Sequence, residues 1–423
     1  MATTEPAPSH MKLGDVANDQ YLSGPRPLSG IRVLAAEQMA ALPFATQLLA
    51  RLGAEVVKVE HPVTGDSGRL SKPAIQDPDG ADVGATFLRN NFNKRSLTLD
   101  LKSPEGVELF LRLAPNFDVV CENFKAGTAN RLGIGYEHVS SHHPEVVYLS
   151  VSGFGNDPAS PYIDRAAYAS IVEGMSGIYE YKRRPGKRPA ANPVGALGDI
   201  SSALFAAIGV LAALRHRDLT GRGQYIDIAM LDATIAMTDI VANFYSMGIV
   251  DEAAAGVGIV ETFKAGRGHF VMQIVREHQF EKVAEITGNK QWYTDERLAT
   301  HAGWQKHFET ILRPGIERWA SDKSHREAVA ILSRAGIAAG ESNSSREIVE
   351  DEHVRVRHML VEMPNEGGDP VLVPGNPIKM SRTPEGPETP VPWLGEHTDE
   401  VLTSELGIDD AELAALRTRG VIK

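Results

Sequence analysis

The chain has 423 residues, of which 42% are apolar and 23% charged, a balance typical of globular enzymes. This length exceeds what one hydrophobic core usually organises, so we expect two domains assembled from discontinuous pieces. The formal net charge is −12 and the longest basic run is Lys182-Arg183-Arg184, which argues against nucleic-acid binding. The single cysteine, Cys121, excludes an intrachain disulfide and a cysteine-cluster metal site, and it fits a reducing cytoplasm.

Neither the hydropathy pattern nor the N-terminal stretch predicts contact with a membrane. The longest apolar run, Ala203–Leu214, is too short to span a bilayer. Residues 1–27 lack a basic region followed by an apolar segment, so we predict no secretory signal and interpret them as a flexible polar arm. The pair His142-His143 lacks metal-ligand spacing. We expect no metal and no tightly bound cofactor.

From Leu28 onward the pattern alternates between strands and helices. Residues 31–34 predict a strand, 43–52 a helix and 55–59 a second strand, which together form a βαβ unit. The remaining expected strands lie at 93–102, 118–121, 146–151 and 225–228. This alternation predicts an α/β fold whose open, mostly parallel, Rossmann-like sheet is covered on both faces.

The pattern of residue types changes twice after this region. We predict that residues 28–245 form the large Rossmann-like domain and that 246–345 form a smaller α+β domain, with a strand at 269–274. Residues 346–423 are expected to return and complete the large domain. The first strand–helix turn, at 35–42, lacks the Gly-x-Gly-x-x-Gly spacing, so a dinucleotide-dependent dehydrogenase is disfavoured.

One acidic residue stands out at the start of the most apolar segment. Asp199 follows Gly195 and Gly198 and precedes the apolar run 203–214, which predicts a long helix. The first turn of a helix has unpaired N–H groups and the positive end of the dipole, so it keeps a carboxylate ionised. Two interpretations follow from the residues alone: Asp199 is a helix N-cap, or it is a nucleophile.

Taken in order, several short motifs resemble the family III (CaiB/BaiF) CoA-transferases, which include formyl-CoA and carnitine-CoA transferases. The resemblance runs from about Leu28 to the carboxyl terminus. The motifs are Gly53-Ala54-Glu55-Val56-Val57-Lys58-Val59-Glu60, Asn93-Lys94-Arg95-Ser96, Glu122-Asn123-Phe124, Arg131-Leu132-Gly133, Leu197-Gly198-Asp199, Thr220-Gly221-Arg222-Gly223-Gln224 and Leu394-Gly395-Glu396-His397-Thr398-Asp399.

The resemblance implies that Asp199 is the catalytic nucleophile of an acyl-CoA:carboxylate CoA-transferase. In that family the aspartate attacks the acyl-CoA thioester to give a mixed anhydride, and the CoA thiolate then converts it to an aspartyl-CoA thioester. An acceptor acid reverses these steps. Coenzyme A and its thioesters are thus substrates, and the resemblance further implies an interlocked homodimer.

Matching positions also imply the residues that surround the substrates. The implied CoA contacts are Ala40, Ala41, His61, Leu99, Asp100, Leu101, Lys102, Asn123, Phe124, Lys125 and Arg131. The acyl group and the acid are expected near Arg69, Tyr168, Ala169 and Gly198, with the basic loop Lys182–Arg188 as a further candidate. Ala40 and Ala169 replace residues that are polar in relatives, which favours a roomier and less polar acyl pocket.

Two alternatives within the same resemblance stay open. An α-methylacyl-CoA racemase needs an acid and a base on opposite faces of the substrate, but Tyr168 and Lys264 stand where racemases have a histidine and a glutamate. A catalytically inactive partner subunit is the other alternative. An intact Asp199 argues against it.

Overall fold

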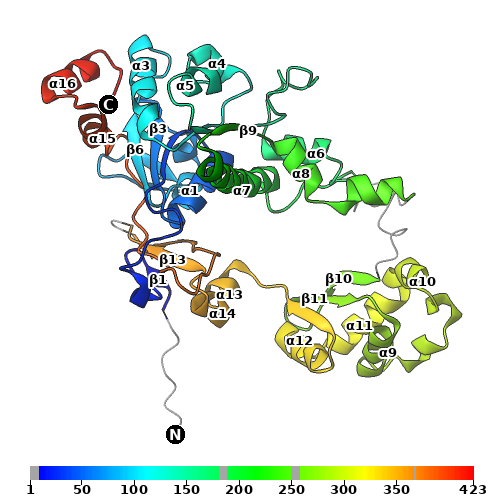
Figure 1. The fold of residues 1–423 in the computed structure, drawn as a ribbon. Helices are drawn as coiled ribbons and strands as arrows, with labels where there is room; N and C mark the ends of the chain where they lie inside the picture. Colours follow the sequence, from blue (N-terminus) through cyan, green and yellow to red (C-terminus); the bar gives the residue numbers. More distant parts are fainter. Residues whose placement is uncertain (1–8, 181–187, 249–257, 366–367) are drawn as a thin grey trace, which may run out of the picture. The chain divides into compact units, whose positions relative to one another are not determined.

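The computed structural model describes residues 9–180, 188–248, 258–365 and 368–423 (Figure 1). The chain divides into two compact units. Unit 1 comprises Met1–Tyr179, Ala191–Thr238 and Arg355–Lys423, and unit 2 comprises Glu180–Ala190 and Asp239–Val354.

Unit 1 is built on a six-stranded sheet in which every pair of neighbouring strands is parallel. Its strands are β2 (Arg32–Ala36), β3 (Glu55–Glu60), β6 (Lys94–Thr98), β7 (Val119–Glu122), β8 (Val147–Ser152) and β9 (Gln224–Ala229). They lie in the order β6-β3-β2-β7-β8-β9. Successive strands are therefore added on one side of β2, up to β6, and then on its other side, from β7 to β9, as in Rossmann-like sheets. The α/β prediction is confirmed.

Alternate residues of the strands feed two separate hydrophobic cores. Val33 and Ala35 of β2 face the core that contains α1 (Ala41–Arg51) and α7 (Leu197–Thr220). Leu34 and Ala36 face the opposite core. The helices of that second layer are α3 (Pro104–Leu113), α4 (Thr128–Leu132), α5 (Tyr136–Ser140), α15 (Thr398–Leu406) and α16 (Asp410–Thr418).

Local signals explain where two of these helices begin. The Ser103 hydroxyl accepts the Gly106 N–H at 3.0 Å and Pro104 opens α3, as the Ser-Pro pair predicts. Helix α1 starts at Ala41, two residues before the predicted start at Pro43. Pro43 fits there because the amides of a helix's first turn have no intrahelical acceptor in any case.

By length and apolar composition, α7 is the only helix in the described part of the chain that could cross a membrane. Half of its apolar window is buried inside this fold, where Ala203, Ala206 and Val210 contact the sheet core. This burial is typical of a core helix.

Within the predicted N-terminal arm, residues 1–8 lie outside the described ranges, and Met11–Leu13 contact the rest of unit 1. Strand β1 (Met11–Lys12) pairs in parallel with β13 (Leu360–Met363), which pairs antiparallel with β14 (Val371–Pro374). Met11 and Leu13 pack against buried Val361 and Met363. These two apolar side chains anchor the segment that its polar composition marked as flexible.

Unit 1 also contains three short helices, α2 (Ala85–Asn90), α6 (Ala169–Met175) and α8 (Met230–Ala236). Strands β4 (Ala74–Gln76) and β5 (Asp82–Gly84) form a small hairpin before α2. Unit 2 contains the antiparallel sheet β10 (Ile259–Lys264), β11 (His269–Ile274) and β12 (Ala338–Glu341). Its longer helices are α9 (Glu277–Ile286), α11 (Arg313–Ala320) and α12 (His325–Arg334).

Candidate active site

A cavity of about 380 Å³ lies in unit 1, lined by turns that follow the carboxyl ends of the sheet strands. The turn after β2 and the turn after β7 form part of its wall, so it lies where the strand order reverses. Rossmann-like sheets bind their ligands at such a switch point. The lining residues are Gln38, Met39, Ala40, Ala41, Ser67, Asn123, Phe124, Lys125, Ala126, Val151, Ser152, Gly153, Phe154, Gly155, Ile163, Arg165, Ala166, Ala167, Tyr168, Asp199 and Met230.

Asp199 is the carboxylate of this cavity. It is the third residue of α7, and the N-cap position is Ala196, which makes no side-chain capping bond. The interpretation of Asp199 as the N-cap is therefore wrong. The Gly198 N–H at this helix start is instead accepted by the buried Glu173 carboxylate of α6, at 3.1 Å.

Burial raises the pKa of Asp199 from 3.8 to about 6. The positive charge of Arg89 on α2 opposes this shift, and the negative charge of Glu173 adds to it. The sequence pattern predicted that the helix start would keep the carboxylate ionised, but loss of hydration outweighs that effect below about pH 6. At neutral pH most of the carboxylate is still ionised and only partly hydrated, a state that favours nucleophilic attack.

Gly198 allows α7 to approach α6 closely. A Cβ atom at this position would lie 2.8 Å from Val172 Cγ2 and 3.2 Å from Ala169 Cα. The glycine before Asp199 thus sets how closely the helix start packs behind the cavity.

Five of the predicted CoA contacts lie together at the cavity. Ala40, Ala41, Asn123, Phe124 and Lys125 all line the cavity. Ala40 ends the turn after β2, Ala41 opens α1, and the other three lie in the turn after β7.

The remaining predicted CoA contacts lie outside the cavity wall. His61 follows β3, and its Nδ1 accepts the Val63 N–H at 3.2 Å. Residues Leu99–Lys102 follow β6, where the Asp100 carboxylate accepts the Lys102 N–H at 3.0 Å. Arg131 lies on α4 and donates to the Thr128 hydroxyl at 2.7 Å. His61 and Leu99–Lys102 therefore share the carboxyl edge of the sheet with the cavity.

Of the residues predicted around the acid, Tyr168 lines the cavity, while Ala169 and Gly198 lie next to the lining residues Tyr168 and Asp199. Arg69 is not at the cavity: its buried guanidinium makes two bonds to the Glu60 carboxylate, of 2.8 and 2.7 Å. Residues 181–187 of the predicted basic loop lie outside the described ranges.

Sequence reasoning missed three charged residues of the site. Arg165 lines the cavity, with its guanidinium 4.4 Å from the centre of the Tyr162 ring. Arg89 and Glu173 influence Asp199 electrostatically. Arg165 could have been found because it lies three residues before the predicted site residue Tyr168. Arg89 and Glu173 are near Asp199 only in the folded structure, so no signal in the sequence pointed to them.

The fold and the cavity define an α/β enzyme with a carboxylate at its ligand site, and comparison with known proteins gives the family. Residues 28–398 match CoA-transferase family III. The succinyl-CoA–L-malate CoA-transferase β subunit of Chloroflexus aurantiacus is 33% identical over 405 residues, covering 94% of this chain and 98% of that protein. The succinate–glutarate CoA-transferase of Agrobacterium fabrum is 34% identical, covering 89% of this chain and 95% of that protein.

Among solved structures, a CaiB/BaiF family protein from Brucella suis superposes with a TM-score of 0.79 and 30% identity, covering 90% of this chain and 99% of that chain. The chain therefore belongs to CoA-transferase family III, as its motifs implied. It is a CoA-transferase, an enzyme whose substrates are CoA thioesters.

Proposed function

We propose that this enzyme moves CoA from a dicarboxylic acyl-CoA donor to a carboxylic acid acceptor, with Asp199 as the covalent nucleophile. The observation that carries the proposal is the half-buried Asp199 carboxylate in a cavity at the sheet's switch point. Among the described residues none donates a hydrogen bond to this carboxylate, so its oxygens are available for attack.

In the first step a carboxylate oxygen of Asp199 forms a bond to the thioester carbonyl carbon, and the C–S bond breaks to release CoA thiolate. The thiolate attacks the aspartyl carbonyl of the resulting anhydride, giving an aspartyl-CoA thioester and freeing the donor acid as its carboxylate. The acceptor carboxylate attacks this thioester and again expels the thiolate. The thiolate then takes the acyl group of the acceptor, and Asp199 is regenerated as a carboxylate.

The cavity wall suits such intermediates because an anhydride and a thioester must survive without reaction with water. Phe124, Val151, Phe154 and Met230 supply apolar lining beside Asp199. Apolar walls exclude water and strengthen the polar interactions that stabilise each tetrahedral intermediate.

We propose a dicarboxylate as the acid because the relatives named above act on succinyl-CoA, malate, succinate or glutarate. Lys125 and Arg165 put two cationic side chains on the cavity wall, and either suits a second carboxylate or a CoA phosphate. The buried free thiol of Cys121 fits a cytoplasmic location.

We also propose that a second chain covers the outer face of α7. Leu204, Phe205, Ile208 and Leu211 form one apolar stripe on this helix, and Leu204 and Ile208 are 45% and 61% exposed. A second identical chain would give the predicted homodimer. A related chain is the alternative, because the Chloroflexus relative is named as one subunit of two. Ile208→Glu should prevent assembly, so that the variant refolds as monomers in sedimentation analysis, whereas Leu219→Glu, near the end of the same helix, should leave assembly unchanged.

The nucleophile is tested by peptide mass mapping after incubation with succinyl-CoA. Hydroxylamine should give an aspartyl hydroxamate at Asp199, and the Asp199→Asn variant should give none. If succinyl-CoA and a panel of other acyl-CoA thioesters leave Asp199 unmodified, the proposed mechanism is wrong. Entry of solvent deuterium into a 2-methylacyl-CoA would then indicate racemase chemistry, and its absence would favour an inactive partner subunit.

A further inference from the structure

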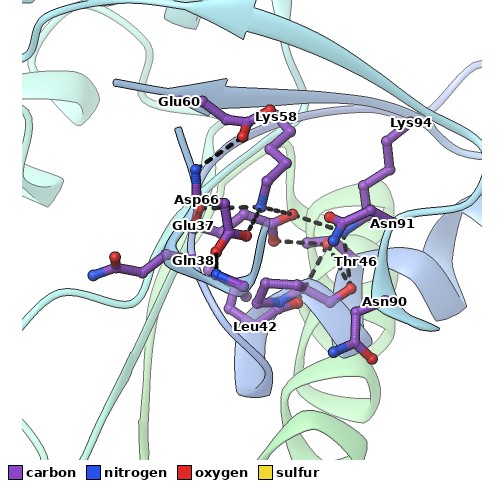
Figure 2. A network of polar contacts seen from close by, with 12 residues as sticks. Glu37, Gln38, Leu42, Thr46, Lys58, Glu60, Asp66, Asn90, Asn91 and Lys94 are labelled. Atoms are coloured by element: carbon purple, nitrogen blue, oxygen red, sulfur yellow. Dashed lines mark hydrogen bonds and ion pairs between the residues drawn. The ribbon is translucent and has the colours of Figure 1, made fainter. Parts of the chain in front are cut away.

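Six charged side chains lie buried beneath the turn after β2. They are Glu37, Lys58, Glu60, Asp66, Arg69 and Lys94. Figure 2 shows the ammonium groups of Lys58 and Lys94 directed at the Glu37 carboxylate, at distances of 3.5 and 2.7 Å. Lys58 is also 2.7 Å from Asp66, and Glu60 pairs with Arg69 at 2.7 Å.

The three acidic groups balance the charge of the three basic ones. Their burial and mutual attraction shift the pKa values of Glu37 and Lys94. Burial alone would raise the pKa of Glu37, but attraction by Lys94 and Lys58 outweighs it and lowers the pKa. Burial lowers the pKa of Lys94 to about 8. Buried ion pairs are rarely the most stable solution for a core, so their presence calls for a role in specifying geometry.

The contacts of this network converge on the backbone around one turn. Lys58 Nζ donates to the Glu37 carbonyl at 3.1 Å, and Lys94 Nζ donates to the Pro43 carbonyl at 2.9 Å. Between them, the Asp66 carboxylate accepts the Met39 N–H at 2.7 Å. Three charged side chains thus hold the backbone before, within and after residues 38–42 (Figure 2).

The held turn has an unusual conformation and faces the active site. Met39 has a φ of 63°, a left-handed value that a non-glycine residue adopts only when its surroundings impose it. Gln38, Met39, Ala40 and Ala41 line the cavity with Asp199. Within the described ranges of the chain, nothing accepts a hydrogen bond from the Ala40 or Ala41 amide.

We infer that Glu37, Lys58, Asp66 and Lys94 are positioning residues that fix the turn at 38–41 as a rigid wall of the Asp199 site. The inference rests on the proposed function. The turn keeps the Ala40 and Ala41 amides in place, where they can donate to the oxyanion that develops when Asp199 attacks a thioester. A shift of the turn by about 1 Å is enough to lower the rate about 100-fold.

A second buried ion pair, at the far end of the helix α1 that follows the turn, supplies a matched control. Arg51, at the C-terminal end of α1, is 3.0 Å from Glu388, and both side chains are largely buried. Arg51 also donates to the Pro374 carbonyl at 2.7 Å. Removal of this pair deletes a buried charge pair of the same kind from the opposite end of α1, away from the residues that line the cavity.

The experiment compares two double variants in which the charge stays balanced. The first variant carries Glu37→Gln and Lys94→Met. The second, the control, carries Arg51→Met and Glu388→Gln. Well below both melting temperatures, we expect the first to lower kcat for CoA transfer from succinyl-CoA about 100-fold while KM changes less than about threefold. The control should keep kcat within about threefold of wild type. Hydrogen–deuterium exchange in the peptide 36–44 should accelerate in the first variant only.

Each outcome separates the positioning role from the proposed function. Unchanged exchange and kcat in the first variant, or equal losses of kcat in both variants, would overturn the positioning role. If exchange is faster in the first variant but succinyl-CoA never modifies Asp199 of the wild-type enzyme, the proposed function is overturned instead. If the first variant does not fold, Asp66→Asn, which keeps an oxygen for the Met39 amide, should remain about tenfold more active than Asp66→Leu. Equal activities of these two would overturn the inference.

Discussion

The Asn123 side chain bonds the backbone of Gln38 in both directions. Its Oδ1 accepts the Gln38 N–H at 3.0 Å and its Nδ2 donates to the Gln38 carbonyl at 2.9 Å. These residues follow β7 and β2, the two strands between which the sheet order reverses. One amide side chain therefore ties together the two turns that form the wall of the cavity.

Asn123→Leu has nearly the same shape and removes both of these hydrogen bonds. We expect a loss of about 1–2 kcal/mol in the free energy of unfolding, because each bond contributes about 1 kcal/mol and the site is partly exposed. Because the two turns would separate, kcat/KM for acyl-CoA should fall at least about tenfold. Urea unfolding and steady-state kinetics measure the two effects. Asn123→Asp, which keeps the acceptor for the Gln38 N–H, should lose less, and equal losses would count against the two-way contact.

Acylation of Asp199 should depend on pH through its own ionisation. With a pKa raised to about 6, the rate should rise with pH, reach half its maximum near pH 6 and level off above pH 7. The negative charge of Glu173 contributes to this raised pKa, so Glu173→Gln should move the midpoint to lower pH. Single-turnover acylation from pH 4.5 to 8 measures both midpoints.

Tyr179→Phe is the control for that shift. It removes the hydroxyl that donates to Glu173 at 2.7 Å but leaves the Glu173 charge in place. Its midpoint should not move to lower pH. A downward shift of equal size in both variants would show that altered packing, rather than charge, determines the ionisation of Asp199.

The same ionisation predicts that the nucleophile costs stability. The folded-state pKa of Asp199 is about 6 and its ordinary value is 3.8, so the folded state binds the proton more tightly than the unfolded state. Stability therefore falls as pH rises from about 4 to 6 and stays lower above that range. Asn cannot ionise, so Asp199→Asn should be about 2–3 kcal/mol more stable than wild type at pH 8 and nearly equal to it at pH 4. Denaturant unfolding at the two pH values measures the difference, and equal stabilities at pH 8 would contradict it.

The hydrophobic periodicity of the sequence predicted the parallel sheet well, because alternating strands and helices bury their apolar faces in a regular way. Residues 55–59 and 118–121 closely match β3 and β7. The periodicity could not predict the charged network, since a lysine such as Lys58 within a strand is typical of a solvent-facing position. Its burial follows from two acids, Glu37 and Asp66, which only the fold places beside it.

The sequence also predicted only those site residues that belong to short local motifs. Asp199 and the turn at 123–125 stand in short motifs, so they could be found from sequence alone. Arg69 was also predicted at the site, but the Glu60 carboxylate binds its guanidinium inside the protein. Glu173 contacts Gly198 from 25 residues away in the chain, and no local pattern signals such a contact.

Gly198→Ala tests whether the close approach of α7 to α6 positions Asp199. The new methyl group would lie 2.8 Å from the buried Val172 side chain and 3.2 Å from the Ala169 backbone, which cannot easily move away. We expect a loss of about 1–3 kcal/mol in stability and at least a tenfold loss of kcat, because the first turn of α7 must shift. Gly209→Ala is the control on the same helix. Its methyl group would meet only the Ile226 side chain, at 3.2 Å, so the gain in helix propensity should keep stability within about 1 kcal/mol of wild type. Thermal unfolding and kcat of the two variants decide the matter, and a Gly198→Ala enzyme with wild-type kcat would show that this approach does not position Asp199.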